Sequence, residues 1–173
     1  MELINKDLCI RNARPEDAAT LTTWWNDGAI MAHAGFPHGL NTSVETVRNQ
    51  IINQDQTKHT RMMIVYQDRA IGEMSYRLLE NKTAEIGIKI CQADLRERGL
   101  GSQLLTMLLD YLFCQLGMDR VILDTDESNT RAQHVYEKLG FIQVGRRPGA
   151  FQDQDGNKRT PIDYELLSKN WTS

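Results

Sequence analysis

The chain has 173 residues, of which 40% are hydrophobic and 25% charged, and its formal net charge is −3. These values are typical of one globular domain, residues 1–173, long enough to bury a sizeable core. They provide no basic surface for nucleic acid, and no apolar run approaches the roughly 18 residues of a membrane span. The start of the chain lacks a signal-peptide pattern, so we expect a cytoplasmic protein. Three scattered cysteines favour neither a disulfide framework nor a zinc site, so no metal is expected.

The first third of the chain is predicted to hold one strand, two helices and an irregular stretch. Pro15 and the two acidic residues after it suit the first turn of a helix. Thr42 or Ser43 can cap the second helix through its hydroxyl. The ranges are 7–11 for the strand, 15–27 and 43–54 for the helices, and 28–40 for the irregular stretch.

The remainder of the chain alternates between strand and helix patterns. Leucines recur at helical spacing after Gly99, and Asp155-Gly156 is a hairpin-turn signal. The predicted strands are 61–66, 70–79, 83–91, 121–124, 141–144 and 162–167, and the predicted helices are 99–117 and 130–139.

The stretch 96–102 lies between a predicted strand and the longest predicted helix, and it carries two glycines at the helix start. Gly99 and Gly101 should each cost roughly 1 kcal/mol relative to alanine inside a helix. We interpret them as allowing a ligand to approach the backbone closely. Unpaired N–H groups and the positive end of the helix dipole favour an anion there, and a pyrophosphate fits. Arg96 and Arg98 add positive charge beside it.

Two common phosphate-binding loops do not match this stretch. A dinucleotide fingerprint needs a third glycine where Leu104 stands, and a P-loop needs Gly-Lys-Ser/Thr where Gly101-Ser102 occurs. The remaining pattern, Arg-x-x-Gly-x-Gly over 96–101, resembles the pyrophosphate loop of the GNAT N-acetyltransferase superfamily. Two further segments are similar to that family. Residues 84–86 match its fourth strand, and 129–141 carry an Asn, a short helix with a Tyr, and then Leu-Gly-Phe.

The resemblance implies an α/β (α+β) fold, in which a mixed, twisted sheet of about seven strands is flanked by about four helices. It further implies that the sheet splays between its fourth and fifth strands, and that the cofactor acetyl-CoA binds in the splay. Asn129 can contact the cofactor, cap the helix that follows, or do both. The residues implied to bind acetyl-CoA are Ile88, Lys89, Ile90, Arg96, Glu97, Arg98, Gly99, Leu100, Gly101, Ser102, Asn129 and Tyr136.

Acetyl transfer to an amine needs a base for the amine, donors for an oxyanion and a proton for the departing thiolate. The resemblance implies that Tyr136 supplies this proton, with core packing as its alternative role. Glu85 is expected to be the base, although it equally fits a strand residue that pairs with a neighbour or faces solvent. The competing proton acceptors are a water relay and the carboxylates of Glu73, Asp124 and Asp126.

The residues expected to bind the acceptor are Trp25, Phe36, Glu85 and Asp124. The expected acceptor is a small-molecule amine, such as a polyamine, an aminoglycoside or an amino acid. One alternative is a protein N-terminus or lysine, because the last predicted hairpin looks similar to that of the ribosomal-protein alanine acetyltransferases. Another is an acyl-CoA sensor without turnover. The sequence leaves the oligomeric state open, and homodimers are common in the family.

Overall fold

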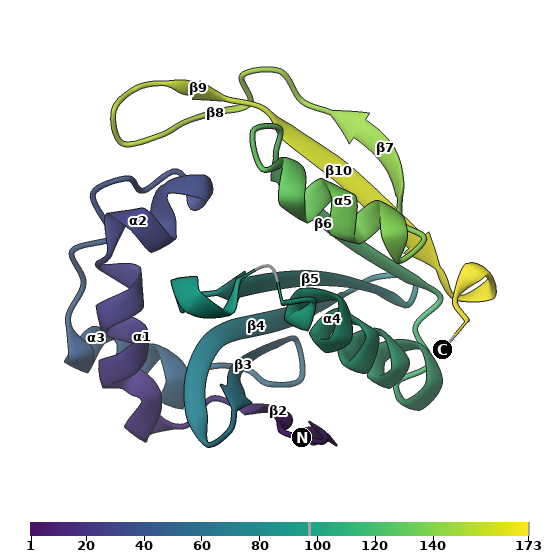
Figure 1. Ribbon diagram of the computed structural model, residues 1–173, viewed down its shortest axis with the longest axis horizontal. Coiled ribbons are helices and arrows are strands. Elements are labelled where there is room, and N and C mark those ends of the chain that lie inside the picture. Colours follow the sequence, from purple (N-terminus) through teal and green to yellow (C-terminus); the bar gives the residue numbers. More distant parts are fainter. Residues whose placement is uncertain (97, 173) are drawn as a thin grey trace.

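The computed structural model describes residues 1–96 and 98–172 (Figure 1). Within them, an eight-stranded sheet has the order β1-β2-β3-β4-β5-β6-β10-β7, and β8 and β9 form a separate two-stranded ribbon. All neighbours in the sheet are antiparallel except β5 and β6, which are parallel. The strands are β1 (Glu2–Asn5), β2 (Leu8–Asn12), β3 (His59–Tyr66), β4 (Arg69–Leu79), β5 (Thr83–Ile90), β6 (Arg120–Asp126), β7 (Ile142–Arg146), β8 (Phe151–Gln152), β9 (Lys158–Arg159) and β10 (Pro161–Leu167).

Five α-helices are present in the described part of the chain, and they are α1 (Ala18–Trp25), α2 (Gly28–Met31), α3 (Val44–Ile52), α4 (Leu100–Asp110) and α5 (Thr130–Lys138). The predicted mixed sheet flanked by helices is therefore confirmed, with one more strand and one more helix than expected. The additional helix, α2, lies in the stretch predicted to be irregular. Asp27 caps it by accepting the Ala29 N–H at 2.8 Å. Gly28 is required there, because a Cβ would lie 1.9 Å from the Pro37 carbonyl oxygen.

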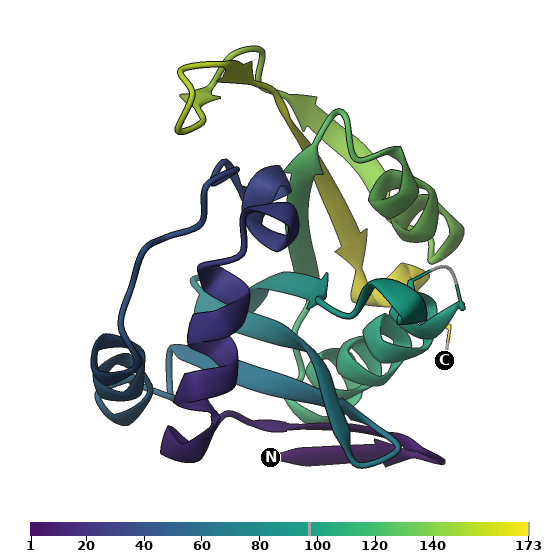
Figure 2. The same ribbon diagram turned by 60° about the vertical axis from the view of Figure 1, so that its left-hand side comes forward.

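Helices cover both faces of the sheet and define two layers of core. Helix α4 buries a leucine face, including Leu104 and Leu108, against strand residues such as Met62. Helices α1 and α3 cover the opposite face, where they pack around Met63. Met62 and Met63 are neighbours in β3, so their side chains point to opposite faces, as strand geometry requires. Figure 2 shows α1 and α3 on one side of the sheet and α4 on the other.

The sheet opens between β5 and β6. Their parallel ladder joins only Thr83, Ala84 and Glu85 to residues of β6. Beyond Glu85, β5 stays paired with β4 as far as Ile90, whereas β6 stays paired with β10. The predicted splay is confirmed, because β5 and β6 are the strands predicted as the fourth and fifth. It leaves one side of the β5 backbone over 87–90 without a partner on β6.

Candidate functional site

The loop before α4 is shaped by a left-handed glycine. Gly99 is the N-cap of α4 and has φ 73, a backbone conformation that favours glycine. Gly101 has no such requirement, and a Cβ on it would meet only the Ile90 Cδ1, at 4.0 Å. The packing of the described protein therefore does not explain the second glycine. The first turn of a helix carries N–H groups without partners inside the helix, so the backbone at this open position is accessible.

The other loop residues divide between structural and exposed positions. Arg96 donates from Nε to the Ile90 carbonyl at 3.3 Å, which fixes the loop to the end of β5. Arg98 is exposed, Ser102 is half-buried and Leu100 is buried in the core, so only the backbone of Leu100 is available to a ligand. Glu97, also predicted to bind the cofactor, lies outside the described residues.

The predicted cofactor-binding strand segment has two faces. Ile88 and Ile90 are partly buried and pack against the core that contains α4. Lys89 points to the opposite face, where its ammonium lies 3.4 Å from the Glu73 carboxylate. Side-chain packing thus accounts for all three residues, and their backbone lies beyond the end of the β5–β6 ladder. A cofactor in the splay would contact that backbone much as an added strand does.

Tyr136 lies on α5 and is 6% exposed. Its ring packs against Phe141 and Tyr164, with centroid distances of 6.0 and 5.7 Å. Its hydroxyl makes no hydrogen bond to any described residue, and the hydroxyl oxygen is not among the fully buried atoms that lack a partner, so it stays accessible from outside the core. Burial, with a smaller contribution from the charge of Asp124, raises the pKa of Tyr136 to about 12. Core packing and an available phenolic proton therefore coexist at this residue.

Asn129 is the N-cap of α5, because its side chain accepts the Ala132 N–H at 3.3 Å. This contact confirms the capping role that the sequence allowed. It also fixes the start of the helix that carries Tyr136.

One cleft, the carboxylate cleft, has a volume of about 280 Å³ and lies beside the paired ends of β5, β6 and β10. Glu85 is bound there by the Arg77 guanidinium, from Nε at 2.9 Å and from Nη2. Arg147 bridges Asp124 and Asp163, each at 2.8 Å. Burial raises the pKa of Asp124; the charges of Asp163 and Glu85 add to this effect, and Arg147 opposes it.

A second cleft, the Trp25 cleft, has a volume of about 340 Å³ and lies between the sheet and the first helices. At its base Glu73 is 6% exposed and accepts hydrogen bonds from Trp25 Nε1 at 2.8 Å and from Arg61. The Arg61 guanidinium also stacks over the Trp25 ring, 4.6 Å from the centroid. Lys89 completes the cluster.

The four residues predicted to bind the acceptor do not come together. Trp25 lines one cleft, while Glu85 and Asp124 line the other. Phe36 is 36% exposed and lines neither. Both clefts open on the same face of the sheet, because Glu85 and Lys89 are four residues apart on β5. The sequence did not predict that Arg61 and the Lys89 side chain would contact Glu73 in the Trp25 cleft. The feature that could have indicated this cluster was Glu73 itself, a charged residue within the apolar pattern of β4.

A contact between two distant segments, which we call the clasp, lies next in sequence to Leu40, one of the residues that line the Trp25 cleft. It joins loop residues 35–39 to the β8–β9 hairpin. The Gln154 side chain accepts from His38 N–H at 2.8 Å and donates to the Gly39 carbonyl at 2.7 Å, and His38 Nε2 lies 2.6 Å from Asp155. The loop is flanked by Met31 and Leu40, which both line that cleft. In Figures 1 and 2 the hairpin extends over α2.

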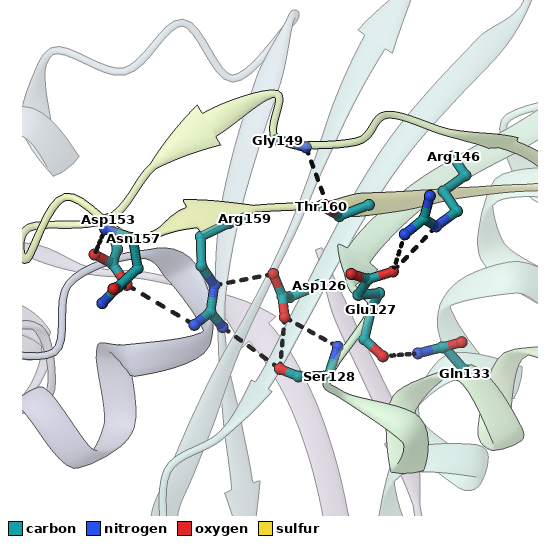
Figure 3. Close-up of polar contacts among 10 residues, drawn as sticks. All are labelled: Asp126, Glu127, Ser128, Gln133, Arg146, Gly149, Asp153, Asn157, Arg159 and Thr160. Carbon is teal, nitrogen blue, oxygen red and sulfur yellow. Dashed lines mark hydrogen bonds and ion pairs between the residues drawn. The ribbon is translucent and has the colours of Figure 1, made fainter.

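The same hairpin is tied to the start of α5 (Figure 3). Arg159 donates to Asp126 at 3.0 Å and to Ser128 at 3.4 Å. Asp126 is 7% exposed and also accepts from the Ser128 hydroxyl and backbone N–H. Burial raises the pKa of Asp126, but the bonds from Ser128 and Arg159 outweigh it, so the net shift is downward. Asp126 is therefore a structural anchor between the hairpin and the helix of Tyr136.

Two classes of site are not found in the described ranges. No group of three His, Cys, Asp or Glu side chains among residues 1–96 and 98–172 is arranged to hold a metal ion. Over the same ranges, every helix is too short or too polar to cross a membrane.

Comparisons with known proteins agree with this geometry. A family model described as the acetyltransferase (GNAT) domain matches residues 7–142. The chain is 24% identical over 172 residues to the uncharacterized N-acetyltransferase p20 of Bacillus licheniformis, covering 96% of this chain and 94% of p20. It is 25% identical over 178 residues to YdaF of Bacillus subtilis (strain 168), covering 97% of this chain and 95% of YdaF. YdaF is provisionally named as a ribosomal N-acetyltransferase.

Solved structures share the fold. Spermidine N-acetyltransferase from Vibrio cholerae, in complex with CoA and spermine, superposes with a TM-score of 0.83 at 22% identity, covering 96% of this chain and 98% of that one. RimL, a ribosomal L7/L12 α-N-protein acetyltransferase in complex with coenzyme A, superposes with a TM-score of 0.81 at 19% identity, covering 96% and 98%. Because the family model spans more than half of the sequence, the chain belongs to the GNAT family of acetyltransferases, whose acetyl donor is acetyl-CoA.

Proposed function

We propose that the protein transfers an acetyl group from acetyl-CoA directly to a primary amine of a small molecule, within a ternary complex. The observation that carries this proposal is the Tyr136 phenol, because its ring is buried while its hydroxyl is accessible and has no hydrogen-bond partner among the described residues. A hydroxyl that the fold leaves accessible and unpaired, on a ring that is otherwise buried, fits one that serves a ligand. A non-catalytic sensor of acyl-CoA would have no need for this proton.

The cofactor would be held by backbone more than by side chains. The N–H groups at the start of α4, from Gly99 to Ser102, would bind the pyrophosphate, with Arg96 and Arg98 adding charge. The β5 backbone from Ile88 to Ile90 would bind the pantetheine arm and offer an N–H to the thioester oxygen. Acetyl-CoA supplies the activated thioester. Asn129 contributes by fixing the start of α5.

Tyr136 and Asp124 are suited to opposite proton transfers. The pKa of Tyr136 is raised to about 12, so its Oη holds a proton at neutral pH, as a donor to the departing thiolate must. The same shift makes the phenol a weaker acid, so we propose that it donates as negative charge develops on the sulfur. Desolvation in the cleft raises the pKa of Asp124, which brings the carboxylate closer to the range a general base needs; its side chain is 54% exposed and pairs with Arg147. We propose Asp124 as the group that receives the amine proton, directly or through water. Glu85, expected from the sequence to be the base, is the second candidate; it pairs with Arg77 as Asp124 pairs with Arg147.

The clasp favours a small acceptor over a folded protein surface, because it fixes the loop that leads into Leu40 in the wall of the Trp25 cleft. The likeness to RimL and YdaF keeps a peptide N-terminus as the alternative acceptor. A screen of small amines and peptides with acetyl-CoA, measured by thiol release, separates the two. Binding of acetyl-CoA without turnover of any amine would instead favour the sensor.

The role of Tyr136 is tested by removing its hydroxyl. Tyr136→Phe should lower turnover by a factor of about ten or more, given the roughly 10²–10⁴-fold contribution of a general acid. Tyr111→Phe is the matched control, since Tyr111 lies in the π-helical turn after α4 and contacts Tyr76. Full activity of Tyr136→Phe would exclude the phenol from the mechanism.

A further inference from the structure

We infer that the acceptor amine also carries an anionic group, as an amino acid does, and that the Lys89 side chain binds this group in the Trp25 cleft. The inference rests on the proposed function and narrows its acceptor class. It begins from the charges around Glu73. One buried carboxylate is contacted there by two cations, Arg61 and Lys89, and by the Trp25 N–H.

The Trp25 cleft therefore has an excess of positive charge. Glu73 is the only acidic residue among the described residues that line it. Asp27 is nearby in sequence, but it does not line the cleft, and its carboxylate caps α2. A cationic group on the acceptor would meet two cations and a carboxylate that is already neutralised. An anionic group would offset the excess charge.

Arg61 and Lys89 differ in how well their hydrogen-bond donors are satisfied by the protein. Arg61 is held by Glu73 on one side and by the Trp25 ring on the other. The nearest partner of the Lys89 ammonium is the Met31 thioether sulfur, at 3.1 Å, and the Glu73 oxygen lies at 3.4 Å. A thioether is a weak acceptor, whereas an ammonium has three N–H donors. The Lys89 side chain is 28% exposed, so a stronger acceptor can reach it.

The carboxylate cleft has the opposite charge excess. In the described part of the chain, three carboxylates line it, those of Glu85, Asp124 and Asp163, and they outnumber the two guanidinium groups that line it, those of Arg120 and Arg147. Along β5, Glu85 and Lys89 are about 13 Å apart at their Cα atoms, since a strand rises roughly 3.3 Å per residue. Their side chains project from one face of the sheet, with Gly87 between them. This polarity orients an acceptor with its anion toward Lys89 and its amine toward Glu85 and Asp124. Because the amine of an α-amino acid is only about 3 Å from its carboxylate, the amine would reach these carboxylates through water.

The lining of the Trp25 cleft further suggests an apolar carbon skeleton. Trp25, Met31 and Leu40 provide apolar walls, and Thr42 and Gln50 are the uncharged polar residues. A free α-amino acid with an apolar side chain, or a short peptide with a carboxylate near its amine, satisfies both the walls and the charges. A polyamine does not provide the anion.

The test compares acceptors that differ only in this charge. A panel of apolar α-amino acids, including leucine and methionine, is offered as free acids and as amides, with spermidine alongside, and kcat/KM is measured by thiol release. We expect each free acid to exceed its amide by about tenfold or more, since a hydrogen bond to a charged group contributes that much. Amidation lowers the pKa of the neighbouring amine, so a larger fraction of the amide is in the neutral, reactive form. Amine ionisation alone would therefore favour the amide, and a preference for the free acid cannot arise from it.

Variants of Lys89 assign the effect to the side chain. Lys89→Met should bring the ratio of free acid to amide close to one, and Lys89→Arg should retain it. Calorimetry with acetyl-CoA verifies that both variants still bind the donor. A ratio near one in the wild type, or a preference for spermidine, would overturn the inference while leaving the proposed function intact. A ratio unchanged in Lys89→Met would overturn the assignment to Lys89, and absence of turnover with every amine and peptide would contradict the proposed function itself.

Discussion

Replacing Gly101 with alanine should affect stability and cofactor binding in opposite directions. Gly101 is the second residue of α4, and a Cβ there would meet only the Ile90 Cδ1, at 4.0 Å. Alanine in a helix is favoured over glycine by roughly 0.5–1 kcal/mol. For a domain of this size, that gain should raise Tm by about 1–4 °C. The same methyl group would occupy the space of a ligand at the helix start, at a cost of about 1–3 kcal/mol, or roughly 5- to 150-fold in Kd for acetyl-CoA.

The stability of each variant is measured by thermal unfolding without ligand, and its affinity for acetyl-CoA by calorimetry. Two glycines with positive φ serve as comparison positions. Gly99 has φ 73 and Gly117 has φ 66, and a Cβ on either would have no neighbour within 4 Å. Alanine at either position should therefore destabilise the fold by about 1–2 kcal/mol through backbone strain alone. Gly117→Ala lies beyond the other end of the helix and should leave Kd unchanged. An unchanged Kd for acetyl-CoA in Gly101→Ala would refute the close approach of a ligand to this loop. A lowered Tm would show that the methyl group does not fit into open space at this position.

Two further predictions concern the first helix and the clasp. Burial raises the pKa of Asp17, but hydrogen bonds from the Arg11 side chain and the Arg14 N–H outweigh it, so the pKa lies below the ordinary 3.8. Asp17→Asn should cost about 1.5–3 kcal/mol of unfolding free energy. This loss of stability is complete above pH 3.8 and disappears as the pH falls through the lowered pKa of Asp17 in the folded protein. Urea titrations in which the difference in unfolding free energy does not change with pH would contradict the prediction. Gln154→Ala removes two hydrogen bonds of the clasp and should raise KM for the acceptor without changing the affinity for acetyl-CoA. Gln152→Ala is the control, because Gln152 is exposed on β8. The same KM in both variants would show that the clasp does not affect acceptor binding.

Most of the fold follows from local patterns. The leucines of α4 recur at helical spacing, and the hairpin at Asp155-Gly156 has the expected left-handed glycine, with φ 80. Strand β1 was missed because most of its residues are exposed, so it shows little apolar alternation. Its hairpin turn also lacks a signal, since Lys6 adopts φ 53 without being Gly or Asn. Helix α2 was missed because four residues are too few to show a period.

The identity of the cofactor could be predicted from the sequence, whereas the two clefts and the residues that line them could not. The glycine loop is one continuous segment, so its residue types carry the signal. The cluster in the Trp25 cleft joins Arg61, Glu73 and Lys89, which are brought together by the register of β3, β4 and β5. The clasp joins residues more than 100 positions apart. Neither arrangement follows from a spacing in the sequence, and both depend on tertiary packing.

The opening between β5 and β6 also creates a strand edge inside the sheet. Edge strands are usually shielded because their free N–H and C=O groups can pair with another chain and start aggregation. The β5 backbone beyond Glu85 has such an edge, next to the half-buried side chains of Ile88 and Ile90. A ligand that pairs with this backbone would shield the edge and, at a hundred times its Kd, would stabilise the fold by about 2.7 kcal/mol. Acetyl-CoA or CoA in the buffer should therefore act as a protectant against self-association during concentration and storage.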